Sequence, residues 1–245
     1  MIGAHVAANE AVHETSQPWS LEALLAGPLL RAAERGLALG APGGHALRVA
    51  ALSYALARTY GLPERVCARL RRSAPFHDIG KVLVPQNLLE KADALEPDER
   101  RAVESHTVLG HELLLASSEP TLREAALIAF CHHERPDGRG YPRQRGGDEI
   151  PLAARIVSVA DVFDALTNDR AYRPALREAH ALELLEAGSG SQFDPEVVRA
   201  FAATLERYPG LGARLRGHTR TPFGPAPDAS ALRHTRAETA ALADV

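Results

Sequence analysis

Apolar residues recur at spacings of three and four along most of the chain, which is the pattern of helices that bury one face. Glycine and proline clusters separate these segments. The expected helices begin near Leu21, His45, Glu64, Glu96, Thr121, Ala153, Arg177 and Pro195. No segment shows the sustained alternation of β-branched residues that indicates a strand. The pattern therefore predicts an all-α helical bundle.

Breaks in this pattern divide the chain into three parts. Residues 1–42 form an N-terminal segment with one helix over 21–39, capped by Ser20. Residues 43–208 form the main domain, interrupted by a polar segment rich in glycine and proline over 132–151, which we expect to be a loop. Residues 209–245 are expected to be a flexible tail.

Composition excludes several classes of protein. The chain has 245 residues, of which 45% are hydrophobic, and a formal net charge of −3, so it lacks the basic field that gathers long nucleic acids. No apolar run approaches the roughly 20 residues that cross a bilayer, so no membrane partner is expected. Two cysteines, Cys67 and Cys131, are too few for a disulfide framework. They favour a cytoplasmic protein with reduced thiols.

Histidine is the residue type that points to chemistry. His45, His77, His106 and His132 each lie on the apolar face of a different expected helix. Packing those faces into one core brings four imidazoles together. Three further donors add to them, two adjacent to these histidines and one on the inward face of the expected helix over 153–168. These are Asp78, His133 and Asp161. Histidines with two carboxylates suit iron, manganese or zinc better than magnesium or calcium.

The order of the motifs resembles one bacterial family. The matching stretches are HDIGK at 77–81, HTVLG at 106–110, HH at 132–133, DGRGYP at 137–142, EIPL at 149–152, ADVFDAL at 160–166 and DRAYR at 169–173. With His45 they resemble the HD-GYP cyclic di-GMP phosphodiesterases over about 43–201, so 43–208 would be the HD-GYP catalytic domain. HD alone is shared by many phosphohydrolases, whereas HD, HH and GYP in this order are specific.

The resemblance implies a two-metal site in the core of an HD-domain bundle. Asp78 would bridge two divalent ions, iron or manganese with zinc as an alternative. One ion would take His45, His77, Asp78 and Asp161. The other would take Asp78, His106, His132 and His133. A water or hydroxide between them would attack phosphorus and convert cyclic di-GMP to pGpG, with GMP as a further product.

Substrate contacts are also implied. Lys81 would act as a second catalytic residue by stabilising the developing phosphoryl charge or the leaving group. Tyr141 in the GYP loop would pack on a guanine, and Asp164 would contact the base. Arg170 and Arg173 would hold phosphate and a guanine edge. A GGDEF cyclase is an expected partner through the GYP loop, and the N-terminal leucines would serve packing or a homodimer.

Two positions depart from the family pattern. Some relatives carry a glutamate four residues before the first metal histidine and hold a third metal with it, but Ala41 stands at that position here. We therefore expect two metals. Pro75 replaces the usual apolar residue before HD and is expected to kink or end the helix just before His77.

Three alternatives remain open at this point. A close variant would prefer a cyclic GMP-AMP dinucleotide. A diiron oxygenase of the HD type would use a similar set of histidines and aspartates but needs no GYP loop. A catalytically weak module would bind the dinucleotide or dock a cyclase.

The stretch RGGDEIPL at 145–152 approaches GGDEF, the motif of the cyclases that make cyclic di-GMP. A cyclase would place this motif on a β-hairpin within an α/β domain, whereas the neighbours here are helical. We therefore interpret Asp148 and Glu149 as loop residues at the end of the GYP loop and not as metal ligands.

Overall fold

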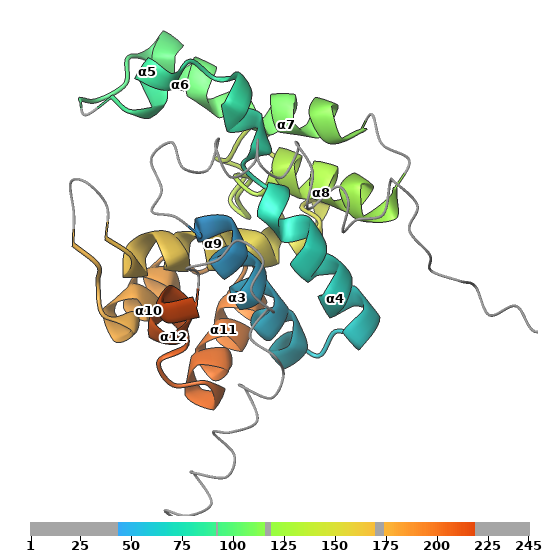
Figure 1. The fold of residues 1–245 in the computed structure, drawn as a ribbon, viewed down its shortest axis with the longest axis vertical. Helices are drawn as coiled ribbons and strands as arrows, with labels where there is room; N and C mark the ends of the chain where they lie inside the picture. The colour runs from blue at the N-terminus through green and yellow to red at the C-terminus, as the bar shows by residue number, and fades with distance from the viewer. Residues whose placement is uncertain (1–43, 92, 116–118, 170–173, 219–245) are drawn as a thin grey trace, which may run out of the picture. The chain divides into compact units, whose positions relative to one another are not determined.

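The computed structural model describes residues 44–91, 93–115, 119–169 and 174–218, and these form the helical arrangement in Figure 1. The α-helices are α3 His45–Tyr60, α4 Glu64–Ser73, α5 Gln86–Leu89, α6 Pro97–Glu104, α7 His106–Leu115, α8 Pro120–Cys131, α9 Leu152–Thr167, α10 Glu178–Ala187, α11 Pro195–Arg207 and α12 Leu211–His218. Short 3₁₀ helices in the described ranges are η1 Ala74–Phe76, η2 Ile79–Leu83 and η3 Gly147–Glu149. No strand occurs among the described residues, where Ser189 and Phe193 form only an isolated bridge. The all-α prediction is confirmed, while the expected helix over 21–39 lies outside the described residues.

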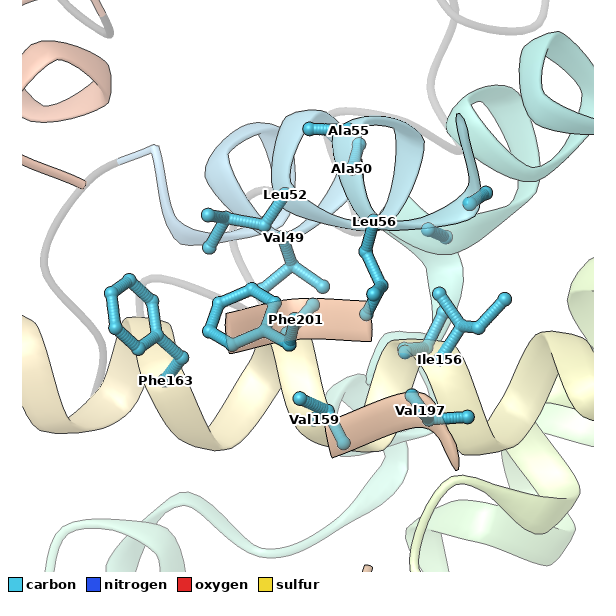
Figure 2. Packing of buried hydrophobic residues seen from close by; sticks show 14 of the residues in the cluster. Val49, Ala50, Leu52, Ala55, Leu56, Ile156, Val159, Phe163, Val197 and Phe201 are labelled. Atoms are coloured by element: carbon cyan, nitrogen blue, oxygen red, sulfur yellow. The ribbon is translucent and has the colours of Figure 1, made fainter. Parts of the chain in front are cut away.

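The main core lies where α3 packs against α9 and α11 (Figure 2). Val49, Leu52 and Leu56 follow one another at helical spacing on α3 and are buried, as the sequence predicted. Phe163 of α9 and Phe201 of α11 meet edge to face, with ring centroids 4.8 Å apart. This core holds α3 and α9 side by side and so fixes the backbone that carries His45 and Asp161.

Pro75 ends the helix before the HD motif, as expected. Helix α4 stops at Ser73, and Pro75 lies at the start of the 3₁₀ turn η1. Proline cannot donate the backbone hydrogen bond that would continue an α-helix. His77 and Asp78 therefore lie between two short 3₁₀ turns, at a bend in the chain.

Glycine at position 80 lets η2 pack directly on α7. A Cβ atom there would lie 1.9 Å from the carbonyl oxygen of His106 and 2.6 Å from the backbone nitrogen of Gly110. No residue with a side chain fits this contact without backbone movement. The close approach sets the HD motif beside the first residue of α7.

Some expected helix boundaries are wrong. The helix from Glu96 does not run through His106, because the chain divides into α6 and α7 around Ser105. Glu119 caps α8 by accepting a hydrogen bond from the backbone N–H of Leu122, so Thr121 is not the cap. The C-terminal tail does not begin at residue 209, because α12 follows there and buries Leu211 and Leu215 in the main core.

None of the helices in the described ranges is both long enough and apolar enough to cross a membrane.

Candidate metal centre

Seven predicted ligands converge from separate elements. His45 begins α3, His77 and Asp78 lie between η1 and η2, His106 begins α7, and Asp161 lies within α9. His132 and His133 follow α8, which lies against α7 (Figure 1). Their donor atoms form two groups, each with all members within 4.8 Å of one another. The groups are Asp78 with His106, His132 and His133, and His45 with His77 and Asp161.

Backbone carbonyls orient three of these histidines. The Nδ1 atom of His77 lies 2.9 Å from the oxygen of Ala74, and that of His106 lies 2.7 Å from the oxygen of Val103. The Nδ1 atom of His132 lies 3.0 Å from the oxygen of Ala129. A carbonyl only accepts hydrogen bonds, so each Nδ1 carries the proton and each Nε2 presents a lone pair.

Among the described residues, those lone pairs have no hydrogen-bond partner. The Nε2 atoms of His77, His106 and His132 are buried without a hydrogen bond, as is Oδ1 of Asp78. Each buried acceptor left unpaired costs about 1–3 kcal/mol, so four in one cluster would be a large penalty unless a cation pairs with them. The donor set is therefore what divalent metal ions require, and these residues fit them.

Asp78 faces both groups. Its Oδ1 atom lies 3.3 Å from Nε2 of His106 and 3.6 Å from Nε2 of His132. Its Oδ2 atom lies 3.5 Å from Nε2 of His77 and accepts a hydrogen bond from Lys81. One carboxylate thus presents a different oxygen to each group, which is the geometry of a bridging ligand.

Asp161 is the second carboxylate of the site. Its Oδ1 atom lies 3.2 Å from Nε2 of His45 and 3.7 Å from Nε2 of His77. Together with Asp78 it gives the centre two acidic groups. The expected ligands thus lie together in the structure, and their binding of metal ions stays a prediction.

At four of the seven residues the pKa shifts favour the protonation states that metal ligands need; these are Asp78, His132, His133 and Asp161. Burial lowers the pKa of His132 and, with the neighbouring imidazoles, holds that of His133 well below its usual value. Burial alone would raise the pKa of Asp78, but Lys81 and the histidines hold it well below its usual value. The histidines around Asp161 outweigh burial in the same way and hold its pKa well below its usual value. Neutral imidazoles and ionised carboxylates are the forms that bind cations.

His45 differs from the other ligands. Burial lowers its pKa, but hydrogen bonds with Asp161 and Asp164 raise it more strongly, to about 9. Its Nδ1 atom lies 2.7 Å from Oδ2 of Asp164, so a carboxylate and not a backbone carbonyl orients this ring.

The predicted base contact of Asp164 does not fit its position. The residue is 2% exposed and lies behind His45. Its carboxylate is also bonded by Arg48 and Asn168, two buried residues that the sequence analysis did not single out. The sequence did contain a hint for Arg48, because this residue follows His45 by one helical turn.

Lys81 and Tyr141 lie beside the centre. Lys81 is partly exposed and ion-paired with Asp78. The Tyr141 ring stacks on His133, with centroids 4.7 Å apart. Burial raises the pKa of Tyr141 above its usual range, so the phenol stays neutral. Arg170 and Arg173, the predicted phosphate contacts, lie outside the described residues, as does Ala41.

The GYP loop is held by a buried glutamate that sequence reasoning missed. Glu134 is 2% exposed, and its carboxylate accepts hydrogen bonds from the backbone N–H groups of Arg143 and Arg145, at 2.7 and 2.9 Å. Gly140 lies so close to the start of the loop that a Cβ atom would be 2.5 Å from the backbone nitrogen of Arg135. The sequence did contain a hint for Glu134, because this acidic residue directly follows His132 and His133 in a loop rich in arginine.

Asp148 and Glu149 lie apart from both donor groups. They belong to the 3₁₀ turn η3 and are exposed. Asp148 contacts Arg155, and Glu149 accepts a hydrogen bond from the backbone N–H of Gly146. Neither is among the clustered donors found in the described part of the chain.

Known proteins match this chain over the same region. The HD domain family matches residues 32–197. A cyclic di-GMP phosphodiesterase of Thermotoga maritima is 41% identical over 157 residues, which cover 64% of this chain and 43% of that protein. The 3′3′-cGAMP-specific phosphodiesterase 2 of Vibrio cholerae is 36% identical over 173 residues, which cover 71% of this chain and 33% of that protein. The match thus spans less than half the length of either relative.

The fold also has a solved counterpart. The structure of Bd1817, described as an HDG"Y"P protein from Bdellovibrio bacteriovorus, matches with a TM-score of 0.54 at 22% identity, covering 67% of this chain and 52% of that one. At this identity the likeness supports the helical fold alone.

Proposed function

Because the chain belongs to the HD domain family, we propose that it is a metal-dependent phosphodiesterase that hydrolyses cyclic di-GMP to the linear dinucleotide pGpG. The observation that carries this proposal is Asp78, whose two oxygens face two separate groups of ligand atoms. A two-metal centre is a common device for cleaving phosphodiesters. Relatives named as cyclic di-GMP and cGAMP phosphodiesterases support a cyclic dinucleotide as the substrate.

Two divalent ions, iron or manganese in this proposal, would neutralise the phosphodiester and make water nucleophilic at neutral pH. Asp78, His106, His132 and His133 would hold one ion. His45, His77, Asp161 and the other oxygen of Asp78 would hold the second. The fixed Nδ1 hydrogen bonds of three of these histidines mean that no ring has to turn when the ions bind.

Hydrolysis adds water across one P–O3′ bond. The ribose 3′ oxygen leaves and gains a proton, while the other nucleotide keeps a 5′ phosphate. Lys81 is the cation of the described site that lies against the centre, through its contact with Asp78. In this proposal its ammonium group stabilises the negative charge that develops on phosphoryl oxygens and the leaving group.

Tyr141 supplies an aromatic surface next to the ligands. Its ring is anchored by stacking on His133, which keeps the GYP loop against the centre. We propose that the remaining surface packs on a purine base, as aromatic rings do in other nucleotide sites. Arg170 and Arg173 are proposed to bind the second phosphate.

A cyclic GMP-AMP dinucleotide is the second candidate substrate. It is favoured by the similarity to the Vibrio cholerae phosphodiesterase whose name specifies 3′3′-cGAMP. Both substrates contain the same phosphodiester, so the metal centre serves either. The two substrates differ in one purine base, which is guanine in cyclic di-GMP and adenine in cyclic GMP-AMP.

The experiment is hydrolysis by anaerobically purified protein loaded with iron or manganese. Cyclic di-GMP, 3′3′-cGAMP and a generic diester are incubated separately, and the products are separated by chromatography. We expect pGpG from cyclic di-GMP, with faster turnover of cyclic dinucleotides than of the generic diester. No turnover of either dinucleotide at full metal occupancy would refute the enzymatic function.

A further inference from the structure

We infer that Asp164 and Arg48 are a buried positioning pair for His45, and that this pair makes the two metal positions unequal. The inference rests on the proposed two-metal centre. In this inference Asp164 orients the metal ligand His45 and does not contact the substrate. Arg48, which no feature of the proposed reaction uses, gains a function as well.

The contacts around Asp164 occupy its whole carboxylate. Oδ2 lies 2.7 Å from Nδ1 of His45 and accepts a hydrogen bond of 2.9 Å from Nη2 of Arg48. Oδ1 accepts from Nε of Arg48 at 2.7 Å and from Nδ2 of Asn168 at 3.0 Å. Arg48 therefore grips the carboxylate with two parallel hydrogen bonds, which fixes its plane as well as its position.

These residues come from two helices of the main core. His45 and Arg48 are one turn apart on α3, while Asp161, Asp164 and Asn168 share one stripe of α9 and its end. All of them except Asp161 are at most 5% exposed. The apolar seam between α3 and α9 seen in Figure 2 therefore continues into a polar cluster that ends at the metal ligands.

The hydrogen bond at Nδ1 decides what Nε2 of His45 can do. A carboxylate accepts the Nδ1 proton, so Nε2 is left as the coordinating atom, on the side of Asp161 at 3.2 Å. A charged acceptor also makes the imidazole more basic than a carbonyl acceptor does. Arg48 keeps this buried carboxylate ionised by pairing with it.

In the described part of the chain, Nδ1 of His77, His106 and His132 has no such side-chain support, because each bonds a backbone carbonyl. Of these, His106 and His132 belong to the group that contains Asp78 and His133. Substitution of Asp164 therefore removes support from the His45, His77 and Asp161 group alone. The structure thus predicts that one metal position can be weakened while the other is left intact.

The test is titration of the metal-free chain with Co²⁺, followed by visible absorption and by metal analysis after dialysis. Wild-type protein is expected to bind two ions per chain. Asp164→Asn keeps the shape but removes the charge, and we expect one ion to bind about 10–100-fold more weakly while the other changes less than about twofold. Asp148→Asn is the matched control, since this exposed aspartate touches neither group.

Arg48→Lys is the second variant, and it keeps the positive charge but loses the two-pronged grip. It is expected to weaken binding of the same single ion. If Asp164→Asn does not fold, the result for Arg48→Lys tests the inference in its place. Equal weakening of both ions, or two ions bound as tightly as in wild type, would overturn the inference. Wild-type protein that binds two ions but hydrolyses no dinucleotide would refute the proposed function and leave the positioning pair standing.

Discussion

Gly80 lies against the carbonyl oxygen of His106 so closely that a Cβ atom at position 80 would be 1.9 Å from that oxygen. The contact joins η2, which follows Asp78, to the first turn of α7. It explains in steric terms why a glycine follows the HD pair by two positions. It also means that the distance between Asp78 and His106 depends on a residue that binds nothing.

Gly80→Ala is therefore expected to push η2 and α7 apart. We predict a loss of unfolding free energy of roughly 2–4 kcal/mol, because the new methyl group meets backbone and not a flexible side chain. We also predict weaker binding of the ion held by Asp78 and His106. Thermal or denaturant unfolding and metal analysis measure the two effects.

Leu83→Ala is the control on the same 3₁₀ turn, because Leu83 is 55% exposed and its loss is expected to cost less than about 0.5 kcal/mol. Gly80→Ala protein with wild-type stability and two tightly bound ions would show that η2 does not set the position of Asp78.

Glu134→Gln tests the anchor of the GYP loop. Glutamine has one acceptor oxygen, so one of the backbone N–H groups of Arg143 and Arg145 loses its partner, at a cost of about 1–3 kcal/mol. We expect two bound ions but hydrolysis slowed roughly 10–100-fold, because the loop that carries Tyr141 shifts. Steady-state kinetics alongside metal analysis measures this. Glu149→Gln on the exposed side of the loop is the control, and equal effects of the two variants would contradict a specific role for Glu134.

Lys81→Met removes the ammonium group beside Asp78 while keeping most of the side-chain volume. We predict a fall in kcat of about 100–1,000-fold, because the charge is needed where the phosphoryl group reacts. KM is expected to change much less, and both ions should remain bound. A rise in KM at unchanged kcat would instead assign Lys81 to substrate binding.

Asp148→Asn tests the interpretation of RGGDEIPL. The carboxylate is exposed and contacts Arg155, so its replacement is expected to leave metal content and the rate of hydrolysis unchanged. Metal analysis and steady-state kinetics of this variant measure the two quantities. A lost ion would mean that the stretch contributes to the centre.

Much of the fold followed from helical periodicity. The apolar stripe of Val49, Leu52 and Leu56 predicted α3, and Pro75 predicted the end of α4, because both signals are local. The helix α12 was missed, since it depends on tertiary contacts of Leu211 and Leu215 that no short-range pattern encodes. The break at Ser105 was missed because the helical spacing of Val103, His106 and Gly110 continues across it.

The convergence of His45, His77, His106 and His132 could be predicted because each stands where an apolar residue belongs. The supports of the site, Arg48 and Glu134, were not predicted, because charged residues are usually exposed and their positions beside the ligands were the one hint of their burial. The resemblance to the HD-GYP family is confirmed by the relatives. The GGDEF cyclase partner, the homodimer and the roles of Arg170 and Arg173 stay predictions.

The central claim is that one carboxylate, Asp78, joins two metal positions into a single catalytic centre. The most direct measurement is the metal content of Asp78→Ala beside that of wild type, both purified anaerobically and assayed with cyclic di-GMP. We predict two ions per chain and pGpG for wild type, and loss of both ions and of hydrolysis for the variant. An Asp78→Ala protein that retains two ions and activity would contradict the account.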